Sequence, residues 1–151
     1  MKIFIASDHA GFELKKFLAE RLFLAGHDVR DLGPKEFNPE DDYPDFVSLV
    51  AEEISREPSS VKGIVIGASG QGEAMCANKF YGVRAAVYYG GNQDIIKFSR
   101  EHNDANILSL GATFLSPAET MIAVTLWLAT PFSGDERHRR RLQKLFNITH
   151  K

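Results

Sequence analysis

Hydrophobic and polar positions divide the chain into two kinds of segment that alternate from one end to the other. Short apolar runs predict strands at residues 2–7, 29–32, 63–66, 85–89 and 107–110, and the run at 63–66 predicts a buried strand. Longer segments with apolar residues at helical spacing separate them and predict helices at about 14–25, 44–56, 73–80, 94–101, 117–128 and 135–146. This alternation is typical of an α/β domain with a parallel sheet.

Five strands joined by right-handed helical crossovers predict a three-layer α/β/α sandwich around a five-stranded parallel, Rossmann-like sheet. No internal repeat, low-complexity stretch or linker interrupts the pattern, so residues 1–151 are predicted to form a single domain. In the common strand order the first strand lies beside the third, and ligands bind where the strands end at that switch point. We therefore expect Ser7, Asp8 and His9 to face the loop from Gly67 to Glu73.

Composition narrows the function classes. With 44% hydrophobic and 25% charged residues, the chain is typical of a globular domain that needs neither disulfides nor a structural metal. The single cysteine, Cys76, falls inside a predicted helix, where a packed side chain is expected rather than a nucleophile, and the five histidines show no metal-ligand spacing. No segment is apolar enough for a signal peptide or a membrane span, so we expect a cytoplasmic protein without a membrane partner.

A formal net charge of −2 gives no general attraction to nucleic acid, so an anionic ligand needs a local basic cluster. Arg137 and Arg141 belong to such a cluster. They are four residues apart in a predicted helix, so they share a face and either clamp one phosphate or form a solvated charged surface.

The segment GASGQGE at 67–73 places three glycines and a serine where a strand turns into a helix. Its backbone N–H groups can hold a phosphate, or the oxyanion that forms when a proton leaves the carbon beside a carbonyl; the alternative is a tight turn that needs glycine for its backbone alone. Glu73 is either a partner of the helix dipole or a base toward a C–H group. The helix start lowers the pKa of Glu73 and burial raises it, and the sequence leaves that balance open.

Two further positions are candidates. Asp8 and His9 follow the first strand at the switch point, which favours a binding role. His102 follows a predicted helix, so it is either a partner of the helix dipole or an acid–base group near neutral pH.

Taken together, these segments resemble the ribose-5-phosphate isomerase B and galactose-6-phosphate isomerase family over nearly the whole chain. Each stretch alone is weakly specific, but five occur in the family's order: SDHAGF at 7–12, DYPDF at 42–46, GASGQGEAMCANK at 67–79, REHNDANIL at 100–108 and RHRRR at 137–141. The resemblance implies a cofactor-free, metal-free aldose–ketose isomerase. Its substrate would be a small sugar phosphate, such as ribose 5-phosphate, converted through a cis-enediol intermediate.

The resemblance also implies roles for single residues. Glu73 would be the base, His102 would open the sugar ring and Ser69 would lie beside the proton path. The family uses either a cysteine at the start of the glycine loop, where this chain has Gly67, or a glutamate at its end, so the chain has the glutamate version. The implied substrate contacts are Asp8, His9, Tyr43, Gly67, Ala68, Gly70, Gln71, Gly72, Asn103, Arg137 and Arg141.

The family's habit of sharing active sites implies a homodimer, with a tetramer left open, in which the last helix, about 135–146, packs on the partner subunit and supplies the arginines. One position departs from the family pattern: Thr113 stands where an arginine usually helps to hold phosphate. Losing one charge-assisted hydrogen bond costs on the order of 1.5 to 3 kcal/mol. We therefore keep a tetrose or hexose phosphate as alternative substrates and expect Thr113 to mark altered specificity rather than neutral drift.

Two other function classes compete with an isomerase. The fold permits a nucleotide-binding module, but the first strand-to-helix turn is SDHAGF and the chain has no GxGxxG or Walker sequence. A sugar-phosphate sensor without catalysis is compatible with Thr113, whereas the presence of Glu73, Ser69 and His102 argues against it.

Overall fold

A computed structural model describes residues 1–148; the last three residues of the predicted domain, 149–151, lie outside the described residues. Its centre is a parallel five-stranded sheet in the order β2-β1-β3-β5-β4. The strands are β1 (Lys2–Ser7), β2 (Asp28–Asp31), β3 (Lys62–Gly67), β4 (Ala85–Tyr88) and β5 (Ile107–Gly111). The predicted fold class and the predicted pairing of β1 with β3 are confirmed.

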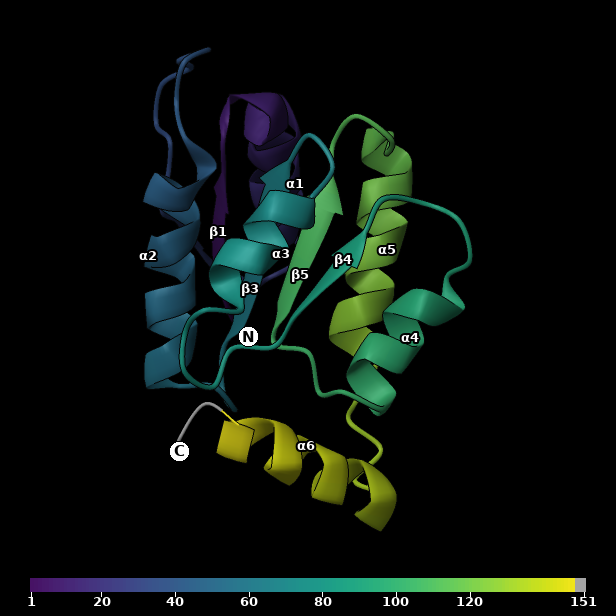
Figure 1. The fold of residues 1–151 in the computed structure, drawn as a ribbon. Coiled ribbons are helices and arrows are strands. Elements are labelled where there is room, and N and C mark those ends of the chain that lie inside the picture. Colours follow the sequence, from purple (N-terminus) through teal and green to yellow (C-terminus); the bar gives the residue numbers. More distant parts are fainter. Residues whose placement is uncertain (149–151) are drawn as a thin grey trace.

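Helices cover both faces of the sheet and complete the three layers (Figure 1). One face packs against α2 (Tyr43–Arg56) and α3 (Gln71–Ala77). The other packs against α1 (Phe12–Leu24), α4 (Asp94–Glu101) and α5 (Pro117–Ala129). The last helix, α6 (Glu136–Ile148), lies outside these layers, across the end of the sheet opposite the strand arrowheads (Figure 1).

Strands β1, β3, β4 and β5 are largely apolar because helices cover both faces of the sheet, whereas the edge strand β2 (DVRD) alternates exposed and half-buried positions. Ile3 and Ile5 of β1 contribute to the core beneath α1 and α5, while Phe4 and Ala6 contribute to the core beneath α2. Successive side chains of a strand point to opposite faces, so a strand buried on both sides has no polar alternation. Burial on both faces explains why apolar runs located β1, β3, β4 and β5 to within about one residue, and β2 was located equally well despite its charged residues.

The glycine loop is shorter than the sequence suggested. Helix α3 begins at Gln71 rather than Glu73 and ends at Ala77 rather than near Phe80. Gly70 precedes it with a φ of 78°, a left-handed conformation that glycine adopts without strain. Glu73 therefore lies in the first turn of the helix, where its side chain turns back toward the end of β3.

The strand order places β5, not β4, next to β3. The segment after β5 therefore runs beside the glycine loop: the N–H of Ala112 donates to the carbonyl of Gly67 at 2.8 Å, and that of Thr113 to the carbonyl of Ala68 at 3.0 Å. Within residues 1–148, no helix has both the length and the apolar character needed to cross a membrane.

Candidate active site

The turn after β1 is fixed by Asp8. One of its carboxylate oxygens accepts hydrogen bonds from the N–H groups of Ala10 and Gly11, at 2.9 and 3.2 Å, and so caps the short 3-10 helix His9–Gly11. Residue 11 must be small, because a Cβ there would lie 2.5 Å from the carbonyl oxygen of Ile66 on β3. This close approach brings Asp8 beside the glycine loop, as the switch-point rule predicts.

The glycine loop holds its carbonyl groups inward. The carbonyl oxygens of Gly67, Ala68 and Gly70 accept hydrogen bonds of 2.6 to 3.0 Å from β5 and the turn after it. Among the described residues, no hydrogen bond uses the N–H groups of Ala68, Ser69 or Gly70. The loop is therefore anchored through its acceptors and keeps its donors available for an anion, as required of an oxyanion-binding loop.

The carboxylate of Glu73 occupies the space above Gly67. Glu73 is only 4% exposed, and a Cβ built on Gly67 would lie 1.8 Å from its Oε1. A side chain at residue 67 and the carboxylate of residue 73 thus compete for one position. The two bases known from the resemblance, a cysteine at 67 or a glutamate at 73, reach the same place from opposite ends of the loop.

Burial decides the balance that the sequence left open at Glu73. It is the largest cause of a raised pKa for the Glu73 carboxyl, and the nearby charge of Asp8 raises this pKa further, whereas the backbone N–H of Glu73 lowers it. A carboxylate with a raised pKa is a stronger proton acceptor, so this environment suits a general base.

Two neighbours complete the wall of the site. The ring of Tyr43 packs on Gly72, where a Cβ would lie 2.8 Å from Cζ and 2.9 Å from the hydroxyl oxygen. Burial, followed by the charge of Glu73, raises the pKa of the Cys76 thiol. That environment favours a neutral packed thiol over a nucleophilic thiolate.

Sequence reasoning missed Asp41. Its Oδ1 accepts hydrogen bonds from the backbone N–H of His9 at 2.9 Å and lies 2.7 Å from His9 Nδ1. The acidic pair directly before Tyr43 was the only signal for it. The ligand atoms of Asp8, His9 and Asp41 lie within 4.8 Å of one another, a spacing that could suit a metal ion. A hydrogen bond accounts for the short contact between Nδ1 and Oδ1, and it already uses that ring nitrogen.

The remaining predicted residues form a second group at the amino end of the sheet. His102 directly follows α4 and packs against two rings, Phe98 at 4.7 Å between centroids and His138 of α6 at 4.4 Å. Asn103 is exposed next to it, and α6 presents Arg137 and Arg141 to solvent.

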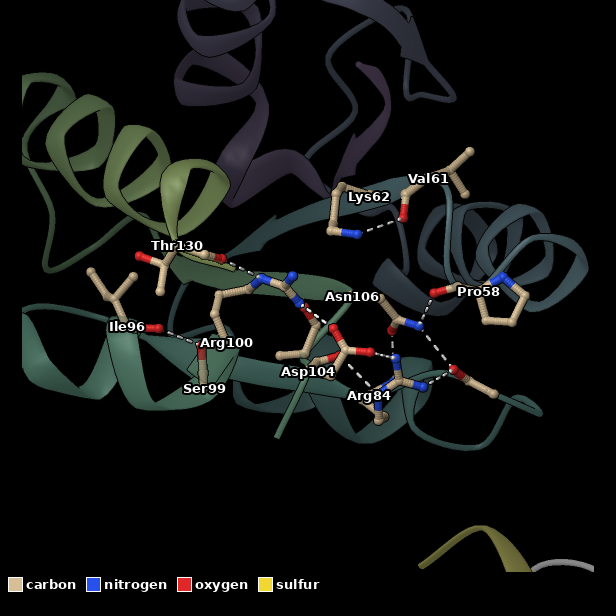
Figure 2. A network of polar contacts seen from close by, with 12 residues as sticks. Pro58, Val61, Lys62, Arg84, Ile96, Ser99, Arg100, Asp104, Asn106 and Thr130 are labelled. Atoms are coloured by element: carbon tan, nitrogen blue, oxygen red, sulfur yellow. Dashed lines mark hydrogen bonds and ion pairs between the residues drawn. The ribbon is translucent and has the colours of Figure 1, made fainter. Parts of the chain in front are cut away.

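A polar network fixes the segment that contains His102 and Asn103. The next residue, Asp104, has a φ of 45°, and its two carboxylate oxygens each accept a 2.9 Å contact, one from Arg84 and one from Arg100. Figure 2 shows this carboxylate between the two guanidinium groups. Arg100 is buried and also donates to the carbonyl of Ala105 at 2.6 Å, so the turn after α4 is tied to the body of the protein.

The two groups lie at opposite ends of the strands. Gly63 pairs with Ile107 at the amino end, and Gly67 pairs with Gly111 at the carboxyl end. Four residue steps at about 3.3 Å each separate these levels by roughly 13 Å along the strands. Since His102 precedes β5 and Glu73 follows β3, a single chain does not bring the two side chains together.

A groove of about 760 Å³ runs between α6 and the body of the protein at this amino end. Its lining includes Arg84, Asn103, Asp104, Phe132, Arg139 and Leu142. Asn103 therefore opens into a concave surface that is well separated from Glu73 along the strands.

Comparison with known proteins identifies this arrangement. The family model described as Ribose/Galactose Isomerase matches residues 3–145. The chain belongs to the ribose/galactose isomerase family. It is therefore an isomerase, as the sequence predicted, rather than the nucleotide-binding module that was kept as an alternative.

Individual members of the ribose/galactose isomerase family agree over almost their full length. Ribose-5-phosphate isomerase B of Mycobacterium leprae is 36% identical over 152 residues, which cover 99% of this chain and 92% of the relative. A crystal structure of ribose-5-phosphate isomerase B from Mycoplasma genitalium with bound ribulose-5-phosphate superposes with a TM-score of 0.95 at 39% identity, covering 99% and 97% of the two chains. The enzyme from Clostridium thermocellum gives a TM-score of 0.92 at 41% identity, with 99% and 98% covered.

Replacing Glu73 by glutamine should stabilise the fold at neutral pH. The pKa of the Glu73 carboxyl is higher in the folded protein than in the unfolded chain. Ionisation of Glu73 at neutral pH therefore lowers the free energy of unfolding, and this loss disappears below the pKa of glutamate in the unfolded chain. We expect Glu73→Gln to melt a few degrees higher than wild type at neutral pH and to lose this gain at acidic pH. The exposed control Glu36→Gln should show no such pH-dependent gain in melting temperature. Equal effects of the two variants would contradict a buried, raised-pKa carboxyl.

A side chain at residue 67 should displace the Glu73 carboxylate. We expect Gly67→Ala to lower isomerase turnover about tenfold or more with only a modest loss of stability, because small misplacements of a reacting group are costly. Gly67→Cys combined with Glu73→Ala should be more active than Glu73→Ala alone, since the thiol then reaches the vacated position. Cys76→Ala, which leaves this space unchanged, should stay within a few fold of wild type. An unaffected Gly67→Ala enzyme would show that the carboxylate acts elsewhere.

Proposed function

We propose that this chain interconverts ribose 5-phosphate and ribulose 5-phosphate, with Glu73 as the base. The observation that supports this most is the buried carboxylate of Glu73, set beside a loop whose N–H groups at residues 68–70 have no hydrogen-bond acceptor among the described residues. The family members compared above are named ribose-5-phosphate isomerase B, and one of them holds ribulose-5-phosphate. Both substrate and product are phosphorylated metabolites, so we include a cytoplasmic location in the proposal.

The reaction needs only proton transfers. Glu73 removes the proton from C2 of the open-chain aldose, and the C–H electrons form a C1–C2 double bond while negative charge moves onto O1. The N–H groups from Ala68 to Gly72 stabilise this enediolate. A proton passes from O2 to O1 beside Ser69, and Glu73 returns its proton to C1, which leaves a ketone at C2. No electron leaves the sugar, so no redox cofactor takes part in the scheme.

The other residues of this end hold the substrate. Asp8 contacts sugar hydroxyls or the ring oxygen, Tyr43 packs on the sugar, and His9 binds the phosphate. The side chain of Thr113 is exposed at the end of β5, where its backbone N–H anchors the glycine loop. With threonine at this position, the positive charge around the phosphate comes from His9 and from arginines of a second chain.

We also propose a homodimer, which the separation of the two groups supports. His102 and Asn103 follow α4 and precede β5, and Arg137 and Arg141 belong to α6, which crosses the amino end of the strands, away from Glu73 of the same chain (Figure 1). A second copy that presents its amino end to this carboxyl end completes the site. There the partner's His102 opens the ring, the partner's Asn103 holds an oxygen and the partner's arginines clamp the phosphate. Helix α6, which lies outside the three layers, packs on that partner.

A panel of pentose, tetrose and hexose phosphates tests the substrate. We expect the highest kcat/KM for ribose 5-phosphate, activity that survives a chelator, and a loss of about 100-fold or more in kcat for Glu73→Gln. The glutamine variant also controls for a contaminating isomerase, because contamination would not respond to the substitution. A higher kcat/KM for a tetrose or hexose phosphate would reassign the substrate to that sugar. Binding without turnover of any sugar would instead indicate a sensor.

Mixing two inactive chains tests the shared site. One chain carries Glu73→Gln and the other carries Arg137→Ala/Arg141→Ala. Random pairing makes half of the dimers mixed, and one of the two sites in each mixed dimer is intact. Activity should therefore return to about a quarter of the wild-type value. The matched control pairs Glu73→Gln with Ser69→Ala, whose changes lie in the same half-site, and should stay inactive. If native mass spectrometry shows mixed dimers and they remain inactive, the site is complete within one subunit.

A further inference from the structure

His9 and Asp41 form a pair that the assigned site residues do not explain. The Asp41 side chain is 6% exposed, whereas that of His9 is 37% exposed. One oxygen, Asp41 Oδ1, accepts the backbone N–H of His9 and contacts its Nδ1, at 2.9 and 2.7 Å. The carboxylate is thus inside the protein and the imidazole is at its surface. With Nδ1 bound to Asp41, only Nε2 of His9 is left to contact a ligand.

The loop that contains Asp41 is anchored independently of His9. At its start, the buried Lys15 ammonium donates to both carboxylate oxygens of Asp31, at 2.8 and 2.9 Å, and to the carbonyl of Pro34 at 2.6 Å. Phe37, further along the loop, packs edge-on against Phe12 of α1 at 5.9 Å between ring centroids. The loop that carries Asp41 is therefore held by contacts that do not involve His9, and burial confines the Asp41 carboxylate beside the imidazole.

The charges around His9 all favour its cationic form. Among the described residues, the charged groups that act on it are the carboxylates of Asp41 and Asp8, and both are negative. The hydrogen bond from Asp41 is the largest cause of a raised pKa for His9, against a smaller opposing effect of desolvation. A cation at His9 would supply positive charge to the proposed phosphate, and Thr113 supplies none.

We propose that Asp41 is a positioning residue that keeps His9 doubly protonated and presents its Nε2–H to the substrate phosphate. Asp41 does not touch the reacting carbons, so it acts on binding of the phosphate group through His9. The role of the phosphate rests on the proposed function, but the coupling of Asp41 to His9 can be measured without turnover.

The test compares Asp41→Asn, which keeps the shape and removes the charge, with Glu40→Gln, which removes one exposed charge from the same loop. By NMR, His9 should titrate at lower pH in Asp41→Asn than in wild type and be unchanged in Glu40→Gln. At mildly alkaline pH, we expect Asp41→Asn to raise KM for ribose 5-phosphate, and the inhibition constant of inorganic phosphate, about tenfold with kcat within about twofold. The phosphate group itself titrates near pH 6, which affects wild type and variants alike.

A double substitution separates positioning from structure. If Asp41 acts through His9, His9→Gln/Asp41→Asn should raise KM no further than His9→Gln alone. Additive losses, a His9 titration unmoved by Asp41→Asn, or an equal fall in kcat would each overturn the proposal. If Asp41→Asn does not fold, the wild-type protein still tests the proposal. Its KM for ribose 5-phosphate must then rise with pH around the pH at which NMR shows His9 losing its proton. Failure of the sugar panel with a normal NMR result would refute the substrate and leave the Asp41–His9 coupling standing.

Discussion

The space above Gly67 is the constraint on which the carboxyl end of this protein depends. Residue 67 ends the central strand β3, and its missing side chain leaves room for the buried carboxylate of Glu73. Gly11 also lacks a side chain, so the turn after β1 packs closely against β3 and Asp8 lies near the Glu73 carboxylate. The pKa of Glu73 is raised because these approaches exclude water and add a second negative charge nearby.

The sheet also acts as a spacer. Each strand end is fixed by its own polar contacts: Asp8 caps the turn at the carboxyl end, and Asp104, between two arginines, fixes the turn at the amino end. Neither half can move toward the other without breaking the parallel ladder between β3 and β5. In the proposed dimer, association of two chains, rather than a conformational change within one, would bring the proton-transfer and ring-opening residues together.

Different physical effects serve the two halves of the proposed substrate. Around the reacting carbons, burial makes a carboxylate basic and a loop offers N–H groups to the charge it creates. Around the phosphate, the relevant groups are exposed cations, His9 in this chain and the arginines of α6, where hydrogen bonding and charge matter more than burial. In the proposed scheme, threonine at 113 carries no positive charge, so that second task depends more on His9 and on Asp41, which holds it.

The sequence by itself determined the features that depend on neighbours along the chain. Apolar runs located the five strands, and the switch-point rule placed Asp8 beside the glycine loop, because strand periodicity and right-handed crossovers are local properties of the backbone. The family resemblance, drawn from five short stretches, was confirmed by the match over residues 3–145.

Only the tertiary structure decided what depends on distance and burial. The position of β5 beside β3, the sign of the pKa shift at Glu73 and the 32-residue contact between His9 and Asp41 have no local signature. The sequence named Glu73 and His102 as parts of one site, but the strands hold them at opposite ends of the sheet. The spacing of residues along the chain does not show which strands become neighbours in the sheet. The pKa of a buried group depends on desolvation by all the residues that pack around it, and these are known only from the tertiary structure.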